Sequence, residues 1–129
     1  MARGFRRFDD AFTCQASAVI ATDGFSAGVK TEVNTLSTEN ADGAFDGEVE
    51  IDVTAWTAPG RCDIYQESLQ HDGAGNTVRR KLGSVAVTGI GKYAVQVDRL
   101  SERGFIVLGA TGTGFTASAS FRAIYPSDS

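Results

Sequence analysis

Apolar and polar residues alternate along most of this chain, and this period of two constrains its fold more than any other feature. The closing stretch, FTASASFRAIY at 115–125, puts apolar residues at odd positions and mostly serine, threonine or arginine at even positions. Because successive side chains of a strand point to opposite faces, such a stretch is a half-buried strand. No window of helical length shows a period of 3.6 residues, and only 37–44 is left as a candidate for a short helical turn.

The alternation recurs at roughly ten-residue spacing and predicts about eight strands. They are expected at 12–21, 28–36, 47–56, 62–70, 77–87, 92–98, 103–109 and 114–125. The residues predicted to share one face within a strand are Val29, Thr31 and Val33; Val49, Ile51, Val53 and Ala55; Cys62, Ile64 and Gln66; and Tyr93, Val95 and Val97. The run GFIVLGA at 104–110 is apolar throughout, which indicates a strand covered on both faces.

Turn signals separate these runs and set the fold class. The dipeptides are Asp23-Gly24, Asp42-Gly43, Asp46-Gly47, Pro59-Gly60, Asp72-Gly73 and Gly75-Asn76. Many short strands with such turns predict an all-β, single-domain antiparallel sandwich that is jelly-roll-like. Its 129 residues are expected to divide into an N-terminal arm at 1–10, the sandwich domain at 11–125 and a flexible C-terminal tail at 126–129.

Charge and composition narrow the classes of partner. The net charge of −4 argues against a nucleic-acid partner, because proteins that bind a phosphate backbone usually carry a basic surface. No segment is long and apolar enough for a membrane span, and the basic start MARGFRRFDD lacks the apolar run of a signal peptide. We therefore expect synthesis in a cytoplasm. Cys14 and Cys62 are interpreted as unpaired, buried thiols, with a disulfide left as the alternative.

The chain shows no residue pattern typical of catalysis. Its one histidine, His71, is expected to be a solvated residue at a hairpin turn. A calcium loop aligned on Gly43 brings Asn40 and Asp42 into register, but it fails at both ends, where Thr38 and Val49 stand. We therefore predict no catalytic residue, no cofactor-binding residue and no metal ligand, with weak calcium binding left open, and expect that the protein is not an enzyme.

The predicted outer faces of the strands carry acidic and aromatic side chains. Glu48, Glu50 and Asp52 alternate along one strand and are interpreted as its wet face. Aromatic residues that stack on sugars are few on the predicted outer faces, namely Tyr65, with Trp56 as a second candidate. A carbohydrate-binding sandwich is thus an alternative for which the sequence defines no platform.

The absence of a reactive cluster favours a structural role. Sandwiches present broad faces and open strand edges, which tend to pair with neighbours. The N-terminal arm combines aromatic and arginine side chains, which are typical of interface anchors. We predict that Arg3, Phe5, Arg6, Arg7 and Phe8 reach a neighbouring subunit, with a frayed terminus as the alternative.

The order of strands and turns over 47–125 resembles the capsid cement (decoration) proteins of tailed bacteriophages. The matching residues are Gly91 to Tyr93, Arg99 and Arg103, Gly112 to Gly114, and Phe115 to Phe121. The first third of the chain, which holds Cys14, departs from the family's pattern, so the resemblance does not define how the protein attaches.

The resemblance implies a jelly-roll virion protein on the capsid surface. Its partner would be the major capsid protein, and its oligomeric state a homo-oligomer, with a trimer favoured. Neighbouring capsid subunits would be clamped by many modest interfaces. Two alternatives are a tail or neck structural protein of the phage and a carbohydrate- or receptor-binding β-sandwich module.

Overall fold

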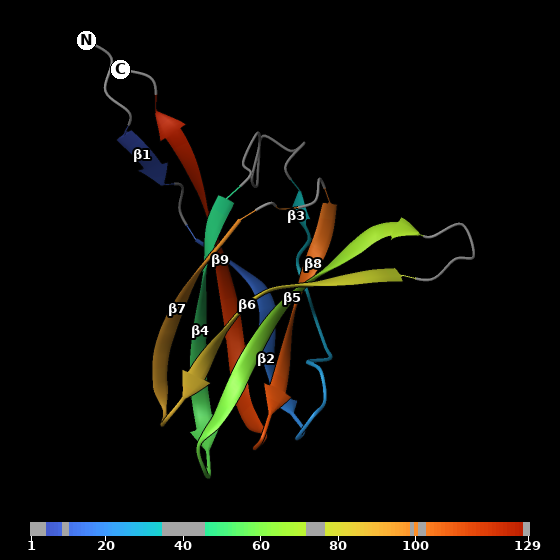
Figure 1. Ribbon diagram of the computed structural model, residues 1–129, viewed down its shortest axis with the longest axis vertical. Helices are drawn as coiled ribbons and strands as arrows, with labels where there is room; N and C mark the ends of the chain where they lie inside the picture. The colour runs from blue at the N-terminus through green and yellow to red at the C-terminus, as the bar shows by residue number, and fades with distance from the viewer. Residues whose placement is uncertain are drawn as a thin grey trace.

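A computed structural model describes residues 5–8, 11–34, 46–71, 77–98, 100 and 103–127. Within these residues the chain forms nine strands and no helix (Figure 1). Their bounds are β1 (Phe5–Phe8), β2 (Phe12–Ile20), β3 (Val33–Asn34), β4 (Asp46–Trp56), β5 (Gly60–His71), β6 (Thr77–Val87), β7 (Gly91–Val97), β8 (Arg103–Thr111) and β9 (Phe115–Ser127). In the described part of the chain, accordingly, no helix is present that could cross a membrane.

The strands form two antiparallel sheets. In the first sheet β9 lies between β4 and β2, β7 pairs with the other edge of β4, and β1 pairs with the end of β9. The second sheet has the order β3–β8–β5–β6. From β2 onward, only β5 and β6 follow each other within one sheet, and every other connection crosses to the opposite sheet. These crossings confirm the predicted antiparallel, jelly-roll-like sandwich.

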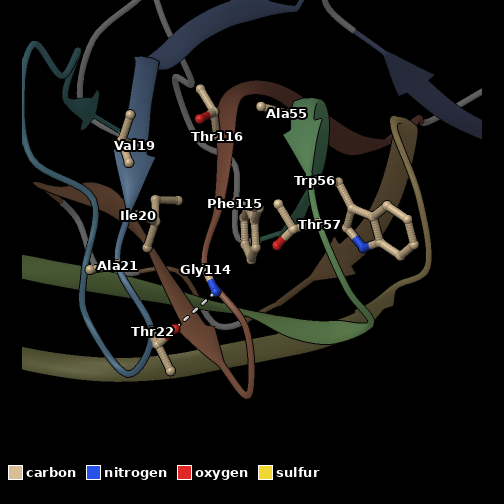
Figure 2. A pocket seen from close by; sticks show the side chains of 10 residues that line it. All are labelled: Val19, Ile20, Ala21, Thr22, Ala55, Trp56, Thr57, Gly114, Phe115 and Thr116. Atoms are coloured by element: carbon tan, nitrogen blue, oxygen red, sulfur yellow. Dashed lines mark hydrogen bonds between the residues drawn. The ribbon is translucent and has the colours of Figure 1, made fainter.

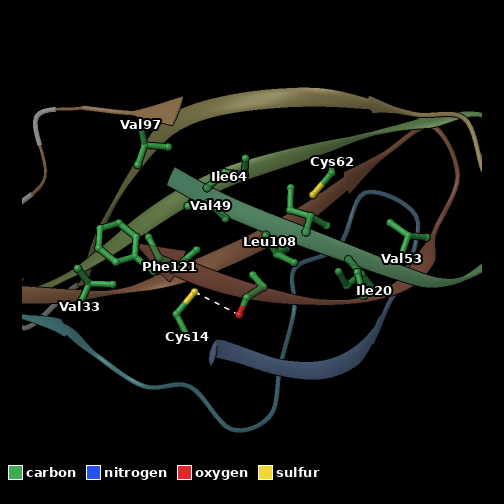
Figure 3. Packing of buried hydrophobic residues seen from close by; sticks show 14 of the residues in the cluster. Cys14, Ile20, Val33, Val49, Val53, Cys62, Ile64, Val97, Leu108 and Phe121 are labelled. Atoms are coloured by element: carbon green, nitrogen blue, oxygen red, sulfur yellow. Dashed lines mark hydrogen bonds between the residues drawn. The ribbon is translucent and has the colours of Figure 1, made fainter. Parts of the chain in front are cut away.

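The predicted alternation accounts for most of the core between the sheets (Figure 3). The inward-facing residues of β9 are all buried: Phe115, Ala117, Ala119, Phe121 and Ala123. Facing them, β5 and β8 contribute Cys62, Ile64, Ile106, Leu108 and Ala110. On β8 the outward-facing Val107 is only 2% exposed, so this strand is covered on both faces as predicted.

The predicted turn at Asp46-Gly47 is wrong, because both residues lie within β4. A side chain at Gly47 would overlap the ring of Phe121, so glycine is needed here for close packing. Later in the same strand, a bulge between Val53 and Ala55 shifts the register with β9. It leaves Ala55 exposed instead of inward-facing, contrary to prediction.

The predicted strand at 28–36 is confirmed only at β3, and its other described residues form no strand. The residues between β2 and β3, 21–32, connect the two sheets and are called the lacing segment. The Ser26 N–H donates to the Leu108 carbonyl of the second sheet, at 2.7 Å. A few residues later the Val29 carbonyl accepts from Ala16 of β2, in the first sheet, at 2.9 Å. The chain then returns to the second sheet, where β3 pairs with the start of β8. Because this segment closes the open side of the sandwich, Val29 is 74% exposed and not inward-facing.

A buried polar network fixes this lacing segment. The Gln15 side chain lies between the sheets, and its Nε2 donates to the carbonyls of Ala16 and Ala27 at 2.9 and 3.1 Å. Its Oε1 accepts a hydrogen bond of 3.0 Å from the Ser26 hydroxyl, which in turn accepts one of 2.9 Å from Leu108 N–H. Each polar group is thus satisfied without water, as burial requires.

The cysteines are free and buried, which confirms the interpretation of unpaired thiols. Cys14 belongs to β2 and Cys62 to β5, and both side chains point into the core (Figure 3). Burial raises the pKa of both thiols to about 12, and the neighbouring Asp63 charge adds to the rise for Cys62. The reactive thiolate is therefore suppressed at neutral pH.

The segments predicted as arm and tail both contain strand residues. Phe5–Phe8 forms a strand inside the predicted arm, and β9 runs to Ser127 within the predicted tail. Phe5 is paired with Ser127 and Phe8 with Ile124. Some predictions concern positions outside the described residues, namely 37–44, Asp42-Gly43, Asp72-Gly73, Gly75-Asn76, Arg3 and Arg99.

The buried network leads to a first prediction. Replacing Ser26 with alanine leaves Gln15 Oε1 and Leu108 N–H without this hydroxyl, so the free energy of unfolding should fall by about 1–3 kcal/mol. Chemical denaturation measures this change. Ser84→Ala, at an exposed serine of β6, is the matched control and should change stability by less than about 0.5 kcal/mol. Equal stability of the two variants would contradict the role of the network.

The buried thiols lead to a second prediction. In the folded protein at pH 8, neither cysteine should react with a thiol-specific disulfide reagent on the time scale of seconds on which exposed thiols react. After unfolding in guanidinium chloride, both cysteines of the chain should react. Absorbance of the released chromophore counts the thiols. Rapid labelling of one thiol in the native state would show that its side chain is accessible.

Candidate binding site

The outer face of the second sheet gathers aromatic and charged side chains. In β5 the inward positions are filled by Cys62, Ile64 and Gln66, all nearly or fully buried. The alternate residues therefore face outward, and these are Arg61, Asp63, Tyr65 and Glu67. The neighbouring strand β6 places Arg79 opposite Glu67 and Lys81 opposite Tyr65.

An aromatic pair lies where the lacing segment meets this face. The turn at 22–23 has Asp23 in the left-handed region, with φ of 58°, and leads into Phe25, which bridges to Gly109 of β8. The rings of Phe25 and Tyr65 meet edge to face, with centroids 5.4 Å apart. Gly109 makes room for both, because a Cβ there would lie 3.2 Å from Tyr65 Cε2 and 3.5 Å from the Phe25 ring. Phe25 remains 46% exposed.

Charged groups hold the aromatic pair in place. The guanidinium carbon of Arg79 lies 4.2 Å from the centroid of the Phe25 ring, a cation–π contact. Arg79 Nη2 also forms a 2.7 Å ion pair with Glu67 Oε2. The two contacts orient Arg79 from different sides, so the ring and the guanidinium stabilise each other.

Asp63 is the most constrained charged group of the site. Its side chain is 4% exposed, and its Oδ1 accepts from Arg61 Nε at 2.8 Å and from Lys81 Nζ at 3.1 Å. Its Oδ2 accepts from the Thr111 hydroxyl at 2.7 Å. Desolvation is the largest influence and raises the pKa of Asp63. The hydrogen bonds from Thr111, Lys81 and Arg61, with the charge of Lys81, outweigh it and hold that pKa below its usual value.

A hollow of about 210 Å³ opens between these groups. Its lining residues are Asp23, Gly24, Phe25, Asp63, Tyr65, Gly109, Ala110 and Thr111. We call it the aromatic hollow. Fixed hydrogen-bonding groups beside aromatic side chains are an arrangement typical of a small-molecule binding site.

A second hollow of about 300 Å³ lies at the end of the sandwich where β2 and β4 stop and β9 starts. Figure 2 shows Phe115 in the middle of its lining, with Trp56 to one side and Val19 and Ile20 to the other. We call it the tryptophan hollow. The indole Nε1 of Trp56 is buried without a hydrogen-bond partner among the described residues.

The predicted site residues are only partly brought together. Tyr65 lies on an outer face as predicted, and Trp56 is half-buried at the tryptophan hollow. The backbone of His71 ends β5, paired with Thr77. Glu50 of the acidic strand face approaches Lys92 at 3.6 Å. Across the described residues, no three or more histidine, cysteine or acidic side chains are placed to hold a metal ion.

Sequence reasoning missed Phe25, Asp23 and Asp63 as members of one site. Phe25 follows the Asp23-Gly24 turn directly, so the turn signal was visible but its partner strand was not. The contact with Gly109 joins residues 84 positions apart, and no local pattern encodes such a pairing.

Comparisons with known proteins give little beyond the fold. No protein-family model matches the chain, and no curated protein matches its sequence. A solved structure with some likeness is the CBM22-1 xylan-binding domain from Paenibacillus barcinonensis Xyn10C, with a TM-score of 0.46 and 15% sequence identity. The likeness covers 88% of this chain and 85% of that domain. Xylan binding is a property of that domain, and the sandwich described above rests on this chain's own sheets.

The environment of Asp63 leads to a third prediction. Its pKa is lower in the folded than in the unfolded state, so its charge stabilises the fold above the unfolded pKa of about 3.9. This stabilisation should disappear as the pH falls from about 5 toward the folded pKa. The stability difference between wild type and Asp63→Asn, from denaturation at several pH values, should therefore be constant near neutrality and shrink in acid.

Thr111→Val provides a second variant for this prediction. It removes one hydrogen bond to the carboxylate and retains the charges of Arg61 and Lys81, so the acid-sensitive part should become smaller without vanishing. A difference between wild type and Asp63→Asn that stays unchanged down to pH 3 would contradict the lowered pKa.

Proposed function

We propose that the chain is a non-catalytic structural protein that works by docking onto other subunits, as a capsid cement protein of a tailed bacteriophage does. The observation that carries this proposal is the ribbon formed by β1 and the end of β9. Figure 1 shows this ribbon extending away from the body of the sandwich.

The ribbon has little to stabilise it by itself. β1 pairs with β9 and with no other strand in the described part of the chain. A two-stranded antiparallel ribbon buries little apolar surface and is at best marginally stable in water. A neighbouring subunit that covers it would supply the missing second layer, which is the kind of contact a docking element makes.

The sequence of the ribbon suits this role. Its first strand is FRRF, and its register places Arg7 opposite Tyr125 and Arg6 opposite Pro126. Aromatic and arginine residues are enriched among the residues that dominate binding energy at interfaces. The predicted arm residues Phe5 to Phe8 therefore keep their interface role in this proposal, with the backbone held as a strand.

Docking of many identical subunits stabilises an assembly because the same interface is repeated many times. Each copy contributes one modest interface, and a symmetric lattice such as a capsid multiplies it. The major capsid protein is the proposed partner, the capsid surface the proposed location and a homotrimer the proposed state. The resemblance of 47–125 to cement proteins supports this choice over other assemblies.

Deletion of residues 2–10 tests the ribbon as the fourth prediction. Light scattering should show that the truncated chain no longer forms oligomers. Sedimentation should show that it is no longer retained on capsids of the phage that carries it. The sandwich should still unfold cooperatively, since its core comes from β2 to β9. Ser26→Ala is the control, because it lowers stability without touching the ribbon and should keep both assembly properties.

Unchanged mass and capsid retention after the deletion would remove the ribbon from the proposal. A wild-type mass of six or twelve subunits would favour the tail or neck protein instead, because those proteins form rings. A monomer that fails to bind capsids even as wild type would overturn the docking function.

A carbohydrate-binding module is the second candidate function. One specific observation favours it, namely the aromatic pair of exposed Phe25 and half-buried Tyr65, which lines a hollow together with the hydrogen-bonding groups of Asp63 and Thr111. Small-molecule sites typically combine aromatic walls with a few fixed polar groups in this way. Such a module would bind its glycan without any capsid partner.

A further inference from the structure

We propose that the aromatic hollow is a binding subsite for a single neutral sugar ring. This inference deepens the carbohydrate-binding candidate and rests on it, whereas it is independent of the docking role of the ribbon. It is carried by three properties of the hollow: its aromatic wall, its unused hydrogen-bond acceptors and its balanced charge.

The aromatic wall provides the apolar contact that a sugar ring needs. One face of a pyranose ring presents C–H groups, which fit against the negative face of an aromatic ring. Phe25 and Tyr65 line the hollow together, and Phe25 is 46% exposed. Arg79 already lies over one face of Phe25, so the ligand would use the remaining aromatic surface, chiefly that of Tyr65.

Hydrogen-bond acceptors also line the hollow. A carboxylate has about four acceptor positions, and Asp63 uses two on Oδ1 and one on Oδ2. Among the contacts of the described residues, Oδ2 thus keeps one position for a sugar hydroxyl. The Thr111 hydroxyl donates to Asp63, which leaves its own lone pairs as acceptors. Asp23, an exposed residue, adds a second carboxylate.

The charge around the hollow selects a neutral ligand. Two acidic side chains, Asp23 and Asp63, line it, and a third, Glu67, is paired with the Arg79 that contacts Phe25. Three basic ones balance them, namely Arg61, Arg79 and Lys81. An acidic sugar or a free cation would gain little from a site without net charge, whereas hydroxyl groups gain from its many fixed donors and acceptors.

The size of the hollow selects a single ring. Its volume of about 210 Å³ is below the roughly 300–1,000 Å³ of pockets that enclose drug-sized ligands. The hollow is also rigid, because backbone hydrogen bonds of 2.8 Å from Asp23 to Ala110 and 3.1 Å from Ala110 to Gly24 fix its rim. A rigid rim reduces the entropy lost on binding.

The tryptophan hollow is the less suitable of the two. Its lining contains no charged residue, and its hydroxyls come from Thr22, Thr57 and Thr116 alone. The polar atom of Trp56 is itself buried, so a ligand in the hollow does not reach it without a rearrangement.

Binding to a panel of oligosaccharides tests this inference as the fifth prediction. The panel contains neutral hexose and pentose oligosaccharides together with uronic-acid and amino-sugar counterparts. Calorimetry should show saturable binding of a neutral sugar, and Tyr65→Ala should weaken it about tenfold or more. Ile90→Ala, at a side chain that is 69% exposed on the β6–β7 turn, is the matched control and should bind as wild type does.

A second measurement avoids dependence on the folding of the variant. In the wild-type protein, the neutral sugar should shift the backbone amide resonances of Gly109 and Thr111 more than those of β7. Asp63→Asn, which preserves the shape of the side chain, should weaken binding about threefold to tenfold, as loss of a charged acceptor does.

Each remaining outcome overturns the inference in a distinguishable way. Preference for acidic or amino sugars would contradict the neutral ligand. Loss of binding in Trp56→Ala but not in Tyr65→Ala would move the site to the tryptophan hollow, and the carbohydrate-binding candidate would stand. If no sugar of the panel binds, both the subsite and that candidate fail, while the docking role of the ribbon is untouched.

Discussion

The hydrogen bond between Gln15 and Ser26 ties together the two layers of this sandwich on their open side. Strands from opposite sheets share few backbone contacts, so a jelly roll depends on side-chain packing and on the segments that cross between layers. Here the crossing segment is anchored at its middle by a hydroxyl that serves both Gln15 of one sheet and Leu108 of the other. Because all these groups are buried, the register of the segment is fixed by the cost of leaving any of them unpaired.

The same anchor positions the candidate binding site. Phe25 is the residue before Ser26, so the bond that ties the layers together also sets the ring of Phe25 on Gly109 and against Tyr65. The outward charges of β5 and β6 then organise around the aromatic pair, with Arg79 stacked on it and Asp63 held by three donors. The site therefore forms where the lacing segment closes the sandwich. It is assembled from a turn and three strands of the second sheet.

The sequence was most informative where a residue's role depends on its immediate neighbours. Alternation alone identified the inward faces of β4, β5, β7 and β9, because burial of one face of a strand imposes a period of two. It was wrong at Gly47, where glycine serves a distant phenylalanine and no turn is present. It was also wrong for Val29 and Thr31, because their segment leaves one sheet for the other. The Phe25–Gly109 contact and the donors around Asp63 depend on pairings across the fold, which a single sequence does not encode.

The ribbon and the two hollows lie at opposite ends of the sandwich. Figure 1 places the ribbon of β1 and the end of β9 at one end of the sandwich, whereas the β4–β5 and β8–β9 turns lie at the other. The tryptophan hollow lies beside those turns, and Thr22 in its lining is followed directly by Asp23 of the aromatic hollow. A subunit anchored by its ribbon would therefore hold both hollows on its far side, facing outward from whatever surface it coats.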